Sequence, residues 1–364
     1  MTVEPPAILL MAYGAPRTDD DLAGYLREVM GRTPSDATVQ EYRRRYRVIG
    51  GSPQMRIAES IRSRLEQRLR GTPGEARVFL ATKHWTPRIQ EVLPAIVAEG
   101  HPHIRAIPLS PFASTWILQP YQAALREGQA RSGGQVELRA GWHRMRPLVE
   151  HWATSIRTSS AGLDPEHSVA FLTAHSLPER MLRMGDPYPG LVREMAQSVA
   201  TTGTLPRWEF TYQSAGNTTE PWLGPDITER MTRWKEQGDS QQLVAPIGFL
   251  FDHLEVLYDL DIVVRGFAEA NGIEYHRVPM PNDDPAVIDA LAEVALAPHW
   301  PPTPVTTPAS RSGPAPRSAG RAAAAPPRGS AHRAASAPRR QRGRGSRPHS
   351  QTRRARGEGT SGSG

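Results

Sequence analysis

Two short stretches of this sequence carry side chains that could share one metal ion or exchange protons. An apolar run from Ser168 to Ala174 ends at His175, which a Leu-Pro pair soon follows. Further along the chain, Glu255 and Asp259 stand in the segment Asp-His-Leu-Glu-Val-Leu-Tyr-Asp, which also follows an apolar run. Imidazole is a metal ligand and a base near neutral pH, and a carboxylate can bind the same ion or accept the same proton. The sequence therefore predicts a site that joins His175 to the carboxylates of the second stretch.

Taken singly, these residues favour structural roles. A lone histidine after a strand more often caps or packs than binds a metal, and the spacing of Asp252 and Glu255 is that of a capping box at a helix start. On one helix face, however, Glu255 and Asp259 are four residues apart, where like charges cost about 0.2–0.5 kcal/mol. Such a pair beside a cleft indicates a helix that handles cations or protons. On that helix His253 is expected to face elsewhere, two positions from Glu255.

Alternating strand and helix signals explain how the two stretches could meet. The first half of the sequence predicts strands at Ala7–Ala12, Arg77–Thr82, Ile104–Leu109 and Val136–Trp142, and the second half at Ser168–Ala174, Trp208–Gln213, Gln242–Ile247 and Ile273–Val278. Helical segments separate them, among them one at Asp252–Ala270. The pattern predicts an α/β fold with two four-stranded parallel sheets, in domains at residues 1–160 and 161–298, whose carboxyl ends face one cleft.

Composition excludes several classes of protein. The chain has 364 residues and no Cys, which rules out disulfides, thiolate zinc sites and an iron–sulfur cluster held by cysteine. No apolar run approaches the roughly 18 residues of a membrane span, and the first residues lack the charged and apolar regions of a signal peptide. We therefore expect a cytoplasmic, monomeric protein without membrane contact.

The basic character of the chain is confined to its last segment. Residues 301–364 hold 13 Arg and one acidic residue, Glu358, so the segment carries +12 while the whole chain carries +7. Its Pro, Ala, Arg, Ser and Gly composition cannot bury enough apolar surface to fold, and residues 299–364 are predicted to be disordered. A nucleic-acid tail is the functional alternative, but no aromatic residue follows Trp300 to stack on bases. An accessory extension is the favoured interpretation.

Read together, the motifs resemble those of the ferrochelatases, over nearly all of residues 1–298. The resemblance rests on Met11-Ala-Tyr13-Gly, Arg45-Tyr46 with Ile49-Gly-Gly, Phe171–Pro178 with Gly185-Asp-Pro-Tyr188, Gln213–Asn217 with Pro221–Asp226, and Pro246-Ile-Gly-Phe with Asp252–Asp259. It is closest to the Gram-positive type, which acts on coproporphyrin III. The resemblance implies two Rossmann-like domains around a porphyrin cleft, Fe²⁺ as a substrate and no prosthetic group.

The resemblance also implies roles for residues at the metal centre. His175 and Glu255 would face the centre of the porphyrin from one side, as metal ligand and proton acceptor. Asp259 would carry protons or ions outward, and Tyr13 would lie near the opposite face of the ring. The outer acidic position one turn beyond Asp259 is Val263 in this chain, which puts an outer ion site in doubt.

Other residues are implied to hold the edges of the porphyrin. Arg45, Tyr46, Ser52 and Tyr121 match positions that bind propionates, and Trp222 could pack against the ring edge. Without the resemblance, Arg45 would be interpreted as part of a solvated charge run and Trp222 as a core residue. The loops near Met30 and Ser52 each seem one residue shorter than usual, and His84 ends a strand near the cleft without an assigned role.

Alternatives remain at the level of substrate and function. The porphyrin could be protoporphyrin IX, or the chain could be a porphyrin or haem carrier without activity, although a carrier does not need the Glu255–Asp259 pair. A sister chelatase that loads cobalt usually has further histidine ligands. Transient contacts with neighbouring haem-pathway enzymes are conceivable, whereas nucleic acid is disfavoured as a partner.

Overall fold

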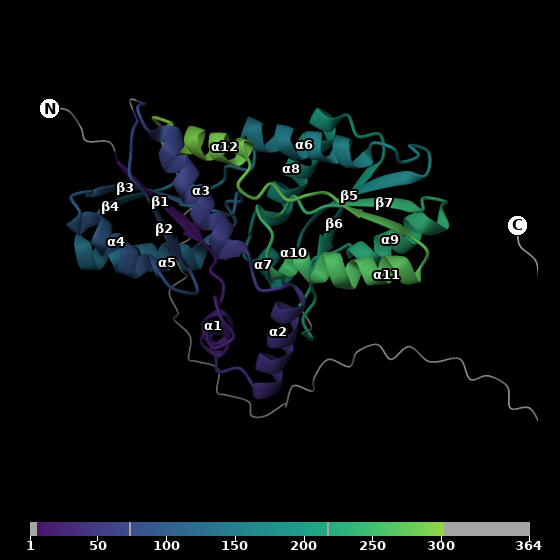
Figure 1. Ribbon diagram of the computed structural model, residues 1–364, viewed down its shortest axis with the longest axis horizontal. Helices are drawn as coiled ribbons and strands as arrows, with labels where there is room; N and C mark the ends of the chain where they lie inside the picture. The colour runs from purple at the N-terminus through teal and green to yellow at the C-terminus, as the bar shows by residue number, and fades with distance from the viewer. Residues whose placement is uncertain (1–5, 73, 217, 302–364) are drawn as a thin grey trace, which may run out of the picture. The chain divides into compact units, whose positions relative to one another are not determined.

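Two parallel β-sheets dominate the computed structural model, which describes residues 6–72, 74–216 and 218–301 (Figure 1). Their strand orders are β2-β1-β3-β4 and β6-β5-β7-β8, and every neighbouring pair is parallel. The predicted fold class, with two four-stranded parallel sheets in series, is confirmed.

The elements of the first half surround the first sheet. They are β1 (Ala7–Ala12), α1 (Asp21–Met30), α2 (Asp36–Val48), α3 (Gln54–Leu69), β2 (Val78–Thr82), α4 (Ile89–Ala98), β3 (His103–Pro108), α5 (Thr115–Ser132), β4 (Gln135–Leu138) and α6 (Arg146–Ser160).

The elements of the second half surround the second sheet. They are β5 (Ser168–His175), α7 (Arg180–Arg183), α8 (Tyr188–Gly203), β6 (Trp208–Gln213), α9 (Ile227–Glu236), β7 (Gln241–Ala245), α10 (Leu254–Leu257), the π-helix η1 (Asp259–Val264), α11 (Arg265–Ala270), β8 (Glu274–Arg277) and α12 (Pro285–Leu296).

The central strands are apolar throughout because helices cover both faces of each sheet. Alternate residues of β1 point to opposite faces: Leu9 packs with helices α4 and α5, whereas Leu10 packs with α3. In the second sheet, Phe171 of β5 packs with α9 and η1, whereas Leu172 packs in the cluster that contains α8. This double burial explains why continuous apolar runs predicted the strands.

Each sheet has a point where the strand order reverses, and both points lie at a central strand. The chain passes from β1 to β2 on one side and then crosses back past β1 to β3 on the other, and β5 likewise lies between β6 and β7. Ligands of open α/β sheets bind beyond the carboxyl ends of the strands at such a switch point. The structure therefore singles out Tyr13, which follows β1, and His175, which ends β5.

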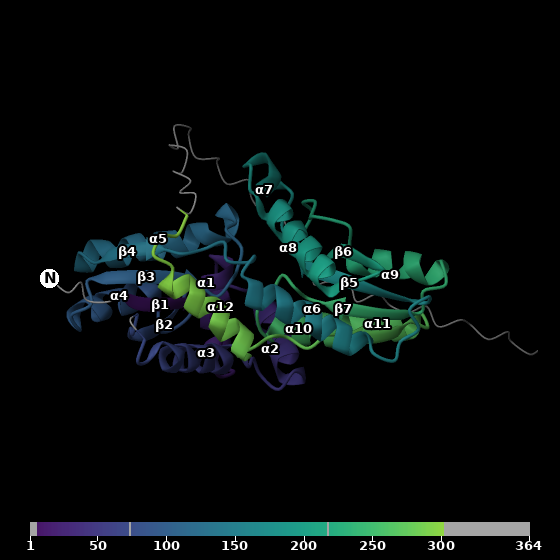
Figure 2. The same ribbon diagram turned by 90° about the horizontal axis from the view of Figure 1, so that it is seen from above.

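Helix α12 joins the two halves. It lies between α3 of the first half and α6, as Figure 2 shows, and α6 in turn packs on α8. Residues of both sheets, including Leu10 and Leu172, belong to one hydrophobic cluster. Because α6 packs largely with the second half, the domain boundary at residues 160 and 161 stays a prediction.

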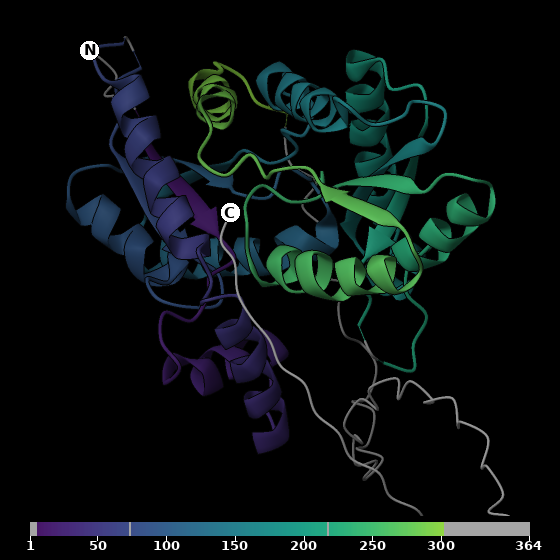
Figure 3. The same ribbon diagram turned by 45° about the vertical axis from the view of Figure 1, so that its right-hand side comes forward.

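Helices α1 and α2 form a separate hairpin beyond the carboxyl end of β1 (Figure 3). Leu22, Tyr25 and Leu26 of α1 pack against Tyr46 of α2 in a small hydrophobic cluster, which Leu254 of α10 joins from the second half. The hairpin therefore reaches from the carboxyl end of β1 to helix α10, which carries Glu255.

The segment predicted to be disordered includes one residue that belongs to the fold. Residues 302–364, most of the segment 299–364, lie outside the described residues. Trp300, however, is part of the fold: its indole Nε1 donates a hydrogen bond to the carbonyl oxygen of Ala140 at 2.8 Å, and its ring packs half-buried against the main hydrophobic cluster. The predicted boundary at residue 299 is wrong because composition alone misses a single anchored aromatic residue.

Candidate active site

A cavity of about 590 Å³ lies at the carboxyl ends of both sheets. From the first half it is lined by Tyr13 and by residues that follow β2 and β3, and from the second half by His175 and residues that follow β7. Tyr25, Tyr42 and Tyr46 of the α1–α2 hairpin close one side, and Trp116 and Tyr121 of α5 close another. The two switch points thus share one cavity, as the strand pattern predicts.

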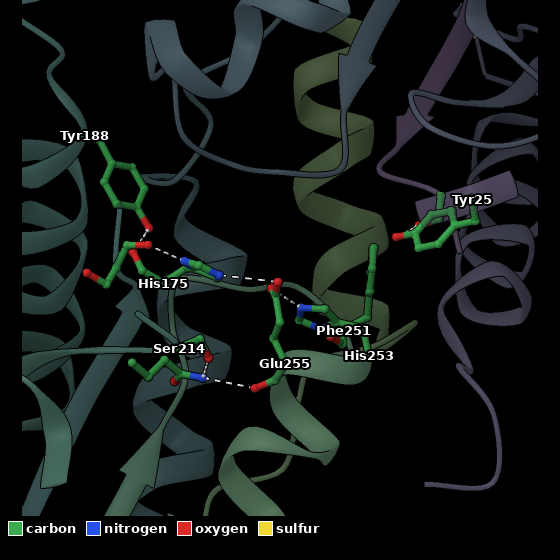
Figure 4. Close-up of polar contacts among 10 residues, drawn as sticks. Tyr25, His175, Tyr188, Ser214, Phe251, His253 and Glu255 are labelled. Carbon is green, nitrogen blue, oxygen red and sulfur yellow. Dashed lines mark hydrogen bonds and ion pairs between the residues drawn. The ribbon is translucent and has the colours of Figure 1, made fainter. Parts of the chain in front are cut away.

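His175 is fixed at the end of β5 by its own backbone and ring. The hydroxyl of Tyr188 donates a hydrogen bond to its carbonyl oxygen at 3.0 Å, and Nδ1 of the imidazole contacts the carbonyl oxygen of Ser176. Nδ1 therefore keeps its proton in both charge states, and Nε2 is the nitrogen that titrates. Nε2 lies 3.3 Å from Oε1 of Glu255 (Figure 4). The predicted pairing of histidine and carboxylate is present.

Glu255 links two histidines. Its other carboxylate oxygen, Oε2, lies 3.2 Å from Nε2 of His253, whose Nδ1 lies 2.9 Å from the carbonyl oxygen of Phe251. The expectation that His253 faces elsewhere is wrong: His253 precedes helix α10 with extended dihedral angles (φ −159°, ψ −175°), so helical spacing does not apply to it.

The capping-box interpretation of Asp252 and Glu255 is also wrong. The residue before α10 is His253, and no side chain caps this helix. Asp252 instead exchanges two 2.9 Å hydrogen bonds with Asn282 and lies 3.4 Å from Arg277. Glu255 is therefore free to face His175 rather than the helix end.

The charges of His175 and Glu255 stabilise each other. Burial favours neutral His175, but the nearby carboxylate of Glu255 and the Ser176 carbonyl outweigh it and raise the pKa of His175 to about 9. Burial also opposes ionisation of Glu255, yet the two histidines hold its pKa well below the usual range. Without a ligand, the site is an imidazolium–carboxylate ion pair at neutral pH.

The second sheet holds Glu255 through its backbone. The amide of Gln213, at the end of β6, donates to the carbonyl oxygen of Glu255 at 3.2 Å and accepts a 2.5 Å hydrogen bond from Thr173 of β5. Thr173 and Gln213 are both buried, and Thr173 lies on the same strand face as His175. Two neighbouring strands thus set the distance between His175 and Glu255.

The predicted single helix Asp252–Ala270 is interrupted at the position of Asp259. Helix α10 ends at Leu257, and the amide of Val263 bonds to the carbonyl of Tyr258, the five-residue spacing of a π-helix. Burial and the charge of Glu255 raise the pKa of Asp259, which a hydrogen bond from Ser214 partly offsets. Asp259 does not line the cavity but feels Glu255 electrostatically, which agrees with its expected neighbouring position.

Tyr13 stands on the opposite wall from the second sheet. Its ring centre lies 4.6 Å from that of His84, and Nζ of Lys83 lies 4.9 Å from the Tyr13 ring and 5.3 Å from the Tyr121 ring. Burial, followed by the charge of Glu255, raises the pKa of Tyr13 above its ordinary value. The turn after it requires Gly14, with φ +99°, because an added Cβ would lie 3.1 Å from the backbone nitrogen of Trp85.

Of the expected ring-edge residues, Tyr46, Ser52 and Tyr121 line the cavity. Ser52 reaches it because α2 ends in a Schellman motif, in which the amide of Gly51 bonds to the carbonyl of Tyr46 at 2.8 Å and Gly50 and Gly51 have positive φ. The chain reverses there and α3 begins beside the cavity.

Arg45 and Trp222 are not brought into the cavity wall. Nε of Arg45 bonds to Glu41 at 2.8 Å, and its guanidinium lies over the rings of Tyr42 and Tyr258. Trp222 donates to Thr218 at 2.8 Å and covers Gly216 so closely that an added Cβ would lie 2.3 Å from the indole. Trp222 thus packs within its own loop.

Sequence reasoning missed several lining residues. Lys83 and His84 follow β2, where burial lowers the pKa of the Lys83 amine to about 8 and, together with Lys83, that of His84 to about 4. The sequence had already placed His84 at a strand end near the cleft without a role, and the carboxyl-end rule that singled out His175 would have added Lys83. Tyr188 stood in a quoted motif without a role, and Tyr42 and Trp116 carried no signal in the sequence.

The described residues hold no group of three metal-binding side chains and no membrane-spanning helix. In the part of the chain that the structure describes, no three His, Asp or Glu side chains gather closely enough to hold a metal ion by themselves. Among the same residues, no helix combines the length and the apolar character needed to cross a bilayer.

Comparison with known proteins agrees with this geometry. The family model described as ferrochelatase matches residues 5–297. A coproporphyrin III ferrochelatase of Anoxybacillus flavithermus is 36% identical over 79% of this chain and 95% of its own, and a ferrochelatase of Herpetosiphon aurantiacus is 34% identical over 79% and 97%. The structure of SirB from Bacillus subtilis with Fe³⁺ is 13% identical, with a TM-score of 0.51 over 80% of this chain and 96% of its own, which shows a shared fold. The match over both sheets and the cavity between them shows that the chain belongs to the ferrochelatase family.

Proposed function

We propose that this ferrochelatase uses coproporphyrin III as its porphyrin, with His175 and Glu255 as its metal centre. Family membership supplies the reaction, the insertion of Fe²⁺ into a free-base porphyrin in haem biosynthesis. The observation that carries the site assignment is the 3.3 Å contact between Nε2 of His175 and Glu255, in a cavity that opens to Tyr13 on the other side.

The reaction requires a metal ligand and a proton acceptor on the same side of the ring. As Fe²⁺ enters, two pyrrole N–H protons leave, so the net charge of the porphyrin core is unchanged. His175, once its Nε2 proton has left to solvent, offers Nε2 to the incoming Fe²⁺, and the carboxylate of Glu255 accepts the two pyrrole protons one at a time, releasing each proton before the next arrives. His253 on the far oxygen of Glu255 and Asp259 one turn away are in position to receive that proton and pass it outward.

Tyr13 and the opposite wall act on the ring rather than on the proton. A flat porphyrin hides its nitrogen lone pairs, so a cleft that favours a puckered ring stabilises the transition state more than the substrate. Tyr13 and Tyr121, with Lys83 against both rings, form a wall on the side away from His175. This wall presses on the ring face while His175 and Glu255 act from the other.

The choice of coproporphyrin III rests on the number of its carboxylates. It has four propionates, whereas protoporphyrin IX has two, so it can use more polar anchors. Tyr46, Ser52 and Gln54 line the cavity near the hairpin, and Arg45 lies beside Tyr46 on α2 with its guanidinium paired to Glu41. A propionate that displaces Glu41 would gain a bidentate arginine contact. The coproporphyrin III ferrochelatases among the relatives support the same choice.

Side-by-side kinetics test this choice. A charge-assisted hydrogen bond contributes on the order of 1.5–3 kcal/mol, so one additional propionate contact should give kcat/KM for coproporphyrin III at least about tenfold above that for protoporphyrin IX. Arg45→Ala should lower the ratio of kcat/KM for coproporphyrin III to kcat/KM for protoporphyrin IX. Arg47→Ala is the matched control, because Arg47 lies on the same helix but pairs with Asp19, whereas the Arg45 guanidinium lies over the ring of Tyr42, which lines the cavity. Equal specificity constants for the two porphyrins would overturn the substrate assignment, and a carrier would bind both without inserting iron.

A further inference from the structure

We propose that Asp186 is a positioning residue that fastens the α5 wall of the cleft to the strand that carries His175. The inference rests on the proposed function, because it concerns how the porphyrin cleft keeps its width. Asp186 belongs to the second half of the chain, between α7 and α8, and is 7% exposed. It does not line the cavity and has no role in the chemistry proposed above.

Three hydrogen bonds converge on the carboxylate of Asp186. Its Oδ2 accepts from the hydroxyl of Ser114 at 3.1 Å and from the backbone N–H of Trp116 at 2.6 Å, both at the start of α5. Its Oδ1 accepts from the backbone N–H of Tyr188 at 2.9 Å, at the start of α8. The carboxylate therefore bonds one helix from each half of the chain.

Helix α5 is capped jointly by Ser114 and Asp186. Ser114 precedes α5, and its hydroxyl oxygen accepts from the amide of Ile117 at 3.2 Å while its proton goes to Asp186. The amide of Trp116 is one of the unpaired donors in the first turn of that 18-residue helix, where a negative charge is favourable. A residue of the second half thus completes the N-terminus of a helix of the first.

Both connected helices touch the site. Helix α5 places Trp116, Ile117 and Tyr121 in the cavity wall. Tyr188 lines the same cavity and donates its hydroxyl proton to the carbonyl oxygen of His175. Asp186 therefore joins a wall of the cleft to the backbone of the metal-centre histidine through one buried carboxylate, and it sets the distance between them.

An isosteric change separates this role from ordinary helix capping. In Asp186→Asn, the amide has one oxygen and one NH₂ group, so in either orientation an NH₂ faces a backbone N–H that needs an acceptor. Asp226→Asn is the matched control: Asp226 caps α9, and a single oxygen, Oδ1, accepts both the amide and the hydroxyl of Thr228. An asparagine oxygen can make both of those bonds.

The test measures porphyrin binding without iron and then insertion kinetics, at a temperature where all variants are folded. We expect Asp186→Asn to raise the porphyrin Kd and KM about tenfold or more while kcat changes less than about threefold, because the metal centre itself is intact. Asp226→Asn should leave all three values near those of the wild type. Ser114→Ala removes one of the two bonds between Asp186 and α5 together with the Ser114 cap on the amide of Ile117, and it leaves the Trp116 bond in place, so it should raise Kd by less than Asp186→Asn does.

The outcomes distinguish this inference from the function it rests on. A lower melting temperature for Asp186→Asn with unchanged Kd and KM would reduce Asp186 to a stabilising residue and overturn the inference. An equal rise in Kd for Asp226→Asn would do the same. If the wild type binds porphyrin but inserts no iron, the proposed function fails, while the Kd series still decides the role of Asp186.

Discussion

Removing the residues after Pro298 should destabilise the protein, whereas removing those after Pro301 should not. The two truncations differ by only three residues, of which Trp300 is anchored in the fold. Loss of its 2.8 Å hydrogen bond to Ala140 costs about 1 kcal/mol. Burial of roughly half of an indole removes about 100 Å² from water, which contributes about 2.5 kcal/mol. The shorter protein should therefore lose about 3.5 kcal/mol in free energy of unfolding.

Thermal unfolding of the two truncated proteins, followed by circular dichroism, measures this difference. A folded part of some 300 residues unfolds with an entropy of roughly 0.6 kcal/mol per kelvin, so about 3.5 kcal/mol corresponds to a Tm lower by about 6 °C. The Tm of the full-length protein with Trp300→Ala should lie between the Tm values of the two truncated proteins. Identical melting temperatures for both truncations would refute the assignment of Trp300 to the fold and restore the boundary at residue 299.

Two further predictions concern the metal centre. Glu255→Gln should lower kcat by at least the roughly 10²-fold typical of a lost general base, with porphyrin Kd little changed; a lower Tm at normal kcat would contradict this. The pKa of His175 is raised to about 9, so the ion pair stabilises the folded protein below pH 6.5, and this stabilisation is lost as pH rises through about 9. Because only neutral imidazole binds metal, the insertion rate should rise with pH up to about 9, and Glu255→Gln should move that rise to lower pH in pH–rate profiles. A rate that is flat between pH 7 and 9 would contradict the ion pair.

The strands were predictable because of how they are buried. Helices cover both faces of each sheet, so β1 and β5 are continuous apolar runs that end at Tyr13 and His175, and the carboxyl-end rule then places both residues at one cleft. Lys83 follows the same rule and was missed only because it was not applied to every strand.

The failures arise where tertiary contacts override local spacing. The backbone at His253 is extended, and Asn282 binds the backbone N–H and the carboxylate of Asp252, which leaves Glu255 outside a capping box. Helix α10 then gives way to a π-turn at Asp259. The pairing of Arg45 with Glu41 follows the four-residue spacing of helical ion pairs, but the contact of its guanidinium with the ring of Tyr258 joins residues far apart in the chain. Amphipathic spacing describes a regular helix, and the segment predicted as one helix at Asp252–Ala270 is divided into α10, η1 and α11.

The most direct test of the account is a comparison of porphyrin binding and iron insertion in His175→Ala. Residues other than His175 contact most of the porphyrin ring and its propionates. The variant should therefore bind coproporphyrin III within about threefold of the wild-type Kd, measured by fluorescence. In the same samples, Fe²⁺ insertion should fall by at least about 10²-fold, because the metal ligand is gone. Near-normal insertion by His175→Ala would contradict the central claim that His175 and Glu255 form the metal centre.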